Sequence, residues 1–156
     1  MRILTGDEVR AAATMREAIE AVREGVIALS AGRARVPLRS VVEMAGGPLL
    51  TMPAVVEGVP TAAVKVVAVC AANLAAGLPT IHAVVLVVDA ATGVPLALMD
   101  GAALTAQRTG AASGLATRLM ARPDAAGAAV CGAGVQGRAQ LEAVCRARPI
   151  RRARVY

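Results

Sequence analysis

The chain has 156 residues and a formal net charge of +6, and 56% of its residues are hydrophobic while 18% are charged. This length suffices for one domain, or for one domain and part of a second, and the apolar content excludes disorder throughout. Phe and Trp are absent and Tyr occurs once, so the core must consist of Ala, Val, Leu, Ile and Met.

The positive charge is concentrated at the end of the chain. Residues 1–122 hold 11 Arg and Lys against 9 Asp and Glu, a net of +2, whereas residues 123–156 hold 6 Arg against 2 acids, a net of +4. The basic residues within 151–154 could contact nucleic acid, but proteins that bind single strands stack the bases on aromatic rings, which this chain almost lacks. We favour a solvated surface and expect no nucleic-acid partner.

The cysteines Cys70, Cys131 and Cys145 are widely spaced among apolar residues. This pattern is typical neither of a disulfide framework nor of a metal site, and buried reduced thiols in a cytoplasmic protein are the simplest interpretation. The start of the chain contains Asp7 and Glu8, which interrupt any apolar leader segment, so we expect none.

The first predicted elements are helices. Thr5 with Glu8, and Thr14 with Glu17, have the spacing of capping boxes. The second pair begins an amphipathic helix that should end at Gly32. The apolar side chains of this helix lie on one face: Met15, Ile19, Val22, Val26 and Leu29.

Strands follow. Residues 35–44 and 49–56 predict a hairpin around a turn at 46–48. The valine-rich runs 61–70 and 80–89 are each long enough for a strand that is covered on both faces. The uncharged stretch 66–88 extends from the first run into the second and is long enough to cross a bilayer, but polar and turn-forming residues interrupt its middle. We therefore expect two strands joined by a turn and no membrane partner.

The last third of the chain predicts a strand at 94–99, a helix at 104–121 that stops before Pro123, and then a strand, a glycine turn, a helix and a strand. The turn, residues 132–137, has the pattern G-x-G-x-x-G of dinucleotide-binding loops. In such loops the first glycine forms the turn, the second admits the pyrophosphate and the third lets the helix pack on the strand. A purely structural glycine turn is the alternative, and the residue that would distinguish NAD from NADP falls at or beyond Tyr156.

Lys65 is the one lysine among 17 basic residues, and it stands within an apolar run. A buried ammonium needs an anionic partner, so a substrate carboxylate or a proton-transfer role is favoured over a side chain that only reaches solvent. From their own surroundings, Arg39 and Arg108 are surface charges, although with Lys65 they would form a strong carboxylate clamp. His82, the single histidine, stands in an apolar strand and is interpreted as a hydrogen-bonded core residue and not as an acid or base.

Six segments in order resemble the ornithine cyclodeaminase/mu-crystallin family. They occupy residues 63–67, 77–80, 89–96, 99–101, 104–109 and 132–136, and so extend over nearly the whole chain. The resemblance implies an α/β protein with a mixed-sheet substrate-binding and dimerisation domain at 1–122. From 123 to 156 it implies the start of a truncated Rossmann domain, which is parallel and doubly wound.

The resemblance also assigns roles to residues. Arg39, Lys65 and Arg108 would bind the carboxylate of an amino acid, with Met52 lining the same pocket and Lys65 also catalytic. The residues implied to contact NAD or NADP are Thr80, Arg108, Thr109, Gly132, Gly134, Val135 and Gln136. A homodimer is implied, and no metal.

The implied activity is that of an NAD(P)-dependent cyclodeaminase or dehydrogenase that transfers hydride between an α-amino acid or imine and the nicotinamide. Family enzymes are about twice as long, and their catalytic aspartate lies in the second half, so we expect this chain alone to be inactive. A non-catalytic binder of nucleotide or of a small ligand, of mu-crystallin type, is the alternative, as is a truncated remnant.

Overall fold

The computed structural model describes every residue from Met1 to Tyr156. The chain forms two compact units. The sheet unit comprises Met1–Val9 and Ile27–Leu104, and the helical unit comprises Arg10–Val26 and Thr105–Tyr156. The predicted division into a substrate domain at 1–122 and a nucleotide domain from 123 concerns function and stays a prediction.

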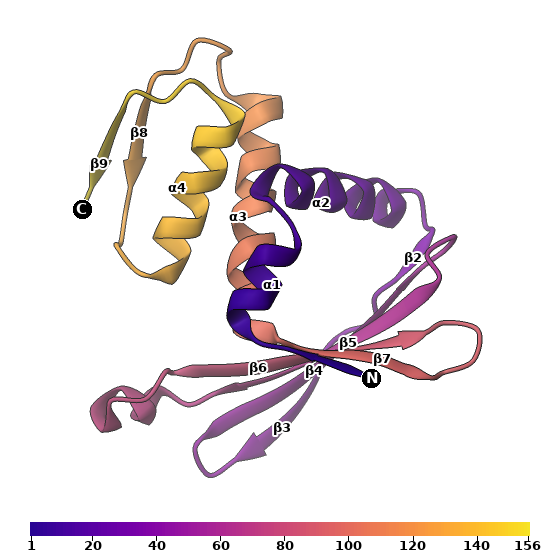
Figure 1. Cartoon of the computed structure of the whole chain (residues 1–156). Coiled ribbons are helices and arrows are strands. Elements are labelled where there is room, and N and C mark those ends of the chain that lie inside the picture. The colour runs from indigo at the N-terminus through magenta and orange to yellow at the C-terminus, as the bar shows by residue number, and fades with distance from the viewer. The chain divides into compact units, whose positions relative to one another are not determined.

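The sheet unit is built on a mixed seven-stranded sheet with the order β1-β7-β6-β5-β4-β2, in which β3 also pairs with β4 (Figure 1). The β1–β7 pair is parallel and the other pairs are antiparallel. The strands are β1 (Arg2–Leu4), β2 (Ala34–Arg35), β3 (Ser40–Met44), β4 (Gly47–Val56), β5 (Thr61–Val69), β6 (Ile81–Asp89) and β7 (Pro95–Asp100). A short 3₁₀ helix, η1 (Ala71–Ala76), joins β5 to β6. The stretch 66–88 is thus two strands and a turn, as expected, and no helix of the structure has the length and apolarity needed to cross a membrane.

The predicted hairpin forms between β3 and β4, with two differences at its ends. Residues 36–39 are not in a strand, because Pro37 cannot donate a backbone hydrogen bond. Gly47 and Pro48, expected in the turn, already pair in β4. Gly47 has φ +131°, and a Cβ atom there would collide with the carbonyl oxygen of Val69, so only glycine fits this position.

Both predicted capping boxes are confirmed. They begin α1 (Gly6–Ala12) and α2 (Met15–Ser30). The Thr14 hydroxyl and backbone N–H donate to the Glu17 carboxylate at 2.7 Å each, and Thr5 and Glu8 make the same pair of bonds. These bonds favour the charged carboxylate and hold the pKa of each glutamate below its ordinary value.

A third carboxylate, that of Asp89, closes the turn between β6 and β7. It accepts hydrogen bonds from the Thr92 hydroxyl at 2.7 Å and from the backbone N–H groups of Thr92 and Ala91. The Thr92 bonds lower the pKa of Asp89 most. The turn is completed by Gly93, whose φ of +74° is in the left-handed region.

The helical unit contains most of α2, most of α3 (Gly101–Met120), α4 (Val135–Ala147) and a parallel pair of strands, β8 (Gly127–Val130) and β9 (Arg152–Val155). The predicted strand, turn, helix and strand after residue 127 are therefore confirmed. The core of this unit consists of Met15, Ile19, Ala111, Leu115 and Ala143. The predicted apolar face of α2 is buried at its start, whereas Val26 and Leu29 are 50% and 54% exposed.

The cysteines are free, as expected, but the prediction that they are buried is wrong. Cys70 is half-buried, and Cys131 and Cys145 are exposed. Cys131 lies in the turn after β8, and Cys145 lies on the solvent side of α4. The apolar residues beside them in the sequence point in other directions and therefore do not bury the two thiols.

Candidate functional site

The glycine turn connects β8 to α4, and its three glycines have three different environments. Gly132 has φ +95°, a backbone conformation that glycine adopts freely and that is strained for other residues. A Cβ atom on Gly137 would collide with the carbonyl oxygen of Gly132, so the first turn of α4 approaches the glycine turn as closely as their backbones allow. A Cβ atom on Gly134 would meet nothing within 4 Å. Open space therefore lies in front of both Gly132 and Gly134. Of the two, only Gly134, with φ −74°, has a backbone conformation that does not itself require glycine.

The N-terminus of α4 begins at this open glycine. Gly134 is the N-cap, no side chain caps the helix, and the first turn holds no acidic residue. Such a terminus presents backbone N–H groups and the positive end of the helix dipole. Both features fit a phosphate or pyrophosphate, and the three glycine environments match those of a dinucleotide-binding turn.

The end of the chain lies against this turn. The N–H of Gly132 donates to the carbonyl oxygen of Tyr156 at 2.8 Å, and the N–H of Tyr156 donates to the carbonyl oxygen of Val130 at 3.0 Å. The last residue after β9 is thereby fixed beside the first glycine. Val135 and Gln136, the other residues assigned to the nucleotide, form the exposed start of α4.

In the sheet unit, the register places two predicted substrate residues side by side. Met52 of β4 pairs with Lys65 of β5, and Lys65 pairs with Val85 of β6. Paired residues share a face of the sheet, so Lys65 and Met52 present their side chains on the same side. Lys65 is half-buried and Val85 is 5% exposed, which makes this face the covered one.

Met52, Lys65 and Val85 thus form one row of paired side chains across the sheet. Arg39 directly precedes β3, whose first residue, Ser40, pairs with Thr51, the neighbour of Met52. Arg39 is exposed. The register thus pairs two of the predicted substrate-binding residues, Met52 and Lys65, and a third, Arg39, lies next to the first residue of β3.

The structure does not bring Thr80 to this row. Thr80 directly precedes β6, five positions before Val85, and is therefore about 16 Å away along the strand. Its carbonyl oxygen accepts a hydrogen bond from the N–H of Cys70 at 2.8 Å. Arg108 and Thr109 belong to the helical unit, where they lie in the first half of α3 with Arg108 exposed and Thr109 half-buried. Their assigned roles stay predictions.

Two structural roles escaped the sequence analysis. Asp100 accepts a hydrogen bond from the N–H of Ala103 at 2.7 Å and so begins α3 three residues earlier than predicted. An aspartate followed by glycine before a helical run is a signal for such a cap. Arg148 donates to the carbonyl oxygens of Arg118, Ala121 and Arg122 at the end of α3. These acceptors are 26 to 30 residues away, so no local pattern reveals them.

Comparison with known proteins identifies the family of this chain. The model of the ornithine cyclodeaminase/mu-crystallin family matches residues 1–156, the entire chain. The chain belongs to this family. The chain has the predicted α/β class, with a mixed sheet followed by the start of a parallel sheet. Solved members of the family have the same fold.

Three relatives show which kinds of enzyme this chain resembles. The chain is 37% identical to a Δ1-pyrroline-2-carboxylate reductase of Bacillus cereus over 158 aligned residues, which include 100% of this chain and 49% of that protein. The structure of the Thermococcus litoralis Δ1-pyrroline-2-carboxylate reductase, in complex with NADH and L-proline, superposes with a TM-score of 0.93 at 45% identity, covering 100% of this chain and 49% of that one. An archaeal alanine dehydrogenase dimer with bound NAD gives a TM-score of 0.92 at 36% identity, covering 100% and 48%. The chain thus spans about half the length of the curated relatives it matches.

Proposed function

We propose that the chain binds NAD(H) or NADP(H) at the glycine turn, as part of an oxidoreductase that acts on an α-amino acid or its imine. The observation that carries the proposal is the distribution of space around the turn. Gly132 and Gly137 are required by backbone geometry, whereas Gly134 is surrounded by open space in which a phosphate can approach the backbone. The T. litoralis and archaeal relatives hold NADH and NAD, which supports a nicotinamide dinucleotide as the ligand.

For the substrate we propose a carboxylate bound by Lys65. Lys65 is half-buried on the covered face of the sheet, where an anion gains more from the charge than it would in water. Met52 beside it supplies an apolar wall, and Arg39, directly before β3, offers a second cation. Lys65 also has the chemistry to hold or relay a proton beside the α-carbon, because an ammonium group carries three donor hydrogens on a flexible stem.

The nicotinamide, when bound, supplies the hydride donor or acceptor. In the oxidative direction the amino acid gives up a hydride from its α-carbon and a proton from its nitrogen, and an imine results. In the reductive direction an imine such as Δ1-pyrroline-2-carboxylate takes up the hydride and a proton and becomes an amino acid. The cations of the sheet unit fix the carboxylate, which is unchanged in either direction.

A cyclodeaminase and a reductase are distinguished by the fate of the cofactor. A reductase or dehydrogenase changes the NAD(P)H absorbance in proportion to turnover. A cyclodeaminase releases ammonia from ornithine with no net change in NAD(P)H, because the hydride returns to the substrate. The assay should therefore follow absorbance and ammonia together, with Δ1-pyrroline-2-carboxylate, pyruvate plus ammonia, and ornithine as substrates. Nucleotide binding with no turnover of any of them would favour the non-catalytic binder.

The nucleotide site itself is tested by Gly134→Ala. The new methyl group meets no protein atom, so the fold should be kept, but it occupies the space through which the pyrophosphate would approach. We expect the affinity for NADH, measured by calorimetry, to fall about tenfold or more, corresponding to the loss of one hydrogen bond to a charged group. Gly127→Ala is the matched control, because Gly127 also has open surroundings but lies at the start of β8, away from the turn. Equal affinities of Gly134→Ala and Gly127→Ala for NADH would contradict the proposed nucleotide site.

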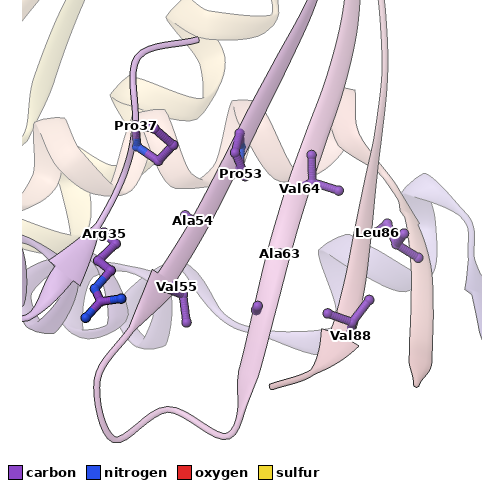
Figure 2. Close-up of a pocket in the computed structure, with 10 residues that line it drawn as sticks. Arg35, Pro37, Pro53, Ala54, Val55, Ala63, Val64, Leu86 and Val88 are labelled. Carbon is purple, nitrogen blue, oxygen red and sulfur yellow. The ribbon is translucent and has the colours of Figure 1, made fainter. Parts of the chain in front are cut away.

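We also propose that the protein is a homodimer, which pairs through the face of the sheet opposite Lys65. This face is apolar and carries a hollow of about 330 Å³, lined among others by Pro53, Val64, Leu86 and Val88 (Figure 2). The sequence predicts that β5 and β6 are covered on both faces, yet in the single chain Val84 on this face is 43% exposed. A second copy of the same face would cover it, and the related alanine dehydrogenase is a dimer.

The dimer proposal is tested by Val64→Lys, which places a charge in the middle of the apolar face. We expect light scattering with size-exclusion chromatography to show a dimer for the original chain and a monomer for the variant. Val41→Lys is the control, because Val41 pairs with Leu50, on the face that carries Met52, and is 51% exposed. A dimer that survives Val64→Lys would show that another surface pairs.

A further inference from the structure

Helices α3 and α4 lie against each other within the helical unit, and their contacts fix how the residues of one helix line up with those of the other. A Cβ atom on Gly110 would be 2.5 Å from the carbonyl oxygen of Ala139, and one on Gly114 would be 3.1 Å from the Cβ atom of Ala143. The contacted residue is 29 positions later in both cases (139 − 110 and 143 − 114). Because each residue advances either helix by about 1.5 Å, the two helices run in the same direction and in step over this turn.

The same offset places Thr109 of α3 level with Arg138, in the first turn of α4. Thr109 lies about 100° around α3 from Gly110, on the flank of the contact between the helices, and side chains of a helix tilt toward its N-terminus. Thr109 is half-buried. Its hydroxyl group is therefore held beside the end of α4 at which we propose that the nucleotide phosphates bind.

The distance between the helices at this level depends on Gly110. Its backbone is regular helix without a positive φ, so the backbone conformation does not require glycine. The requirement comes from space alone, because the nearest atom is a backbone oxygen of Ala139 that cannot rotate aside. Glycine lowers the stability of a helix interior relative to alanine, and the gain that offsets this cost is the close approach of α3 to the start of α4.

We propose that Gly110 is a positioning residue for the nucleotide. It holds the Thr109 hydroxyl close enough to the start of α4 for that hydroxyl and the free N–H groups of α4 to bind the cofactor together. The inference rests on the proposed nucleotide binding at the glycine turn. Gly110 touches no ligand itself and acts through Thr109.

Variants of the two residues test this coupling, with the affinity for NADH measured by calorimetry on samples shown to be folded. Thr109→Val removes the hydroxyl at nearly constant volume and should weaken NADH binding about tenfold, through the loss of one hydrogen bond. Gly110→Ala should weaken it by a similar factor. The double variant should bind NADH no more weakly than the weaker single variant, because both changes remove the same contact.

Gly114→Ala is the matched control. The new methyl group would meet side-chain atoms of Ile19 and Ala143, one helical turn farther from the start of α4, and the Ile19 side chain can rotate aside. We expect lower stability in urea with unchanged affinity for NADH. If Gly110→Ala does not fold, Ala139→Val crowds the same contact from the side of α4 and should show the same dependence on Thr109.

Two results would overturn the inference and leave the nucleotide site in place. One is an unchanged affinity for NADH in folded Gly110→Ala. The other is a double variant in which the two losses multiply, because Gly110 would then act independently of Thr109. Failure of the wild-type chain to bind NADH at all would overturn both the inference and the proposed nucleotide site.

Discussion

Gly110 of α3 lies against the backbone of Ala139 in α4, so that a Cβ atom on Gly110 would be 2.5 Å from the Ala139 carbonyl oxygen. Four residues along α3, a Cβ atom on Gly114 would be 2.7 Å from Ile19 and 3.1 Å from the Cβ atom of Ala143. The two glycines therefore set the distance between α3 and its neighbours in the helical unit.

We expect Gly110→Ala to destabilise the fold by about 3 kcal/mol or more, because the atom that must give way is backbone and cannot rotate aside. Urea unfolding measures the loss. The matched control is Gly25→Ala in α2, where a Cβ atom meets nothing within 4 Å. There the same substitution should stabilise the helix by ~0.5–1 kcal/mol, since alanine is the better helix former. Two effects of the same sign would contradict the packing argument.

Arg148 should act as the C-terminal cap of α3. Its guanidinium group donates to the carbonyl oxygens of Arg118 and Ala121 at 2.7 Å each and of Arg122 at 2.9 Å. We expect Arg148→Met to lower the free energy of unfolding by about 2 kcal/mol, through the loss of hydrogen bonds to a charged group at the negative end of the helix. Arg146→Met, at an exposed position two residues earlier, should change it little.

The capping box of α2 should make stability depend on acid pH. Because the Thr14 bonds lower the pKa of Glu17 in the folded chain, the stabilisation is fully present above the ordinary glutamate pKa and is lost as the pH falls through the lowered folded value. Glu17→Gln should therefore be less stable than the original chain at about pH 7, and the difference should shrink toward about pH 3. Urea unfolding across this range measures it. If the difference in the free energy of unfolding grew as the pH fell, the prediction would be contradicted.

Lys65→Met is expected to weaken the binding of the substrate carboxylate and to leave nucleotide binding unchanged. With NADH present, calorimetry should show the affinity for L-proline falling about tenfold or more, because the cation that pairs with the carboxylate is gone. Arg33→Met removes an exposed cation outside the Lys65 row and serves as the control. An equal loss in both variants would indicate general electrostatics and not a binding site.

The sequence by itself predicted the features that depend on neighbouring residues. The capping boxes of Thr5 and Thr14 join groups three positions apart, and the glycine turn is encoded in residues 132–137. These features need only local hydrogen bonds and the backbone freedom of glycine, so a short segment contains all the information. The family resemblance, carried by short motifs in order, was confirmed over the whole chain.

Only the tertiary structure decided how distant segments meet. The register of β4 and β5 pairs Met52 with Lys65, and a shift by one residue would have turned the two side chains to opposite faces. Packing likewise placed Arg148 at the end of α3, Tyr156 at Gly132, and two of the three cysteines in solvent. Such contacts depend on the position and angle at which whole elements pack. The residue types fix which local structures are allowed, but they do not fix those positions.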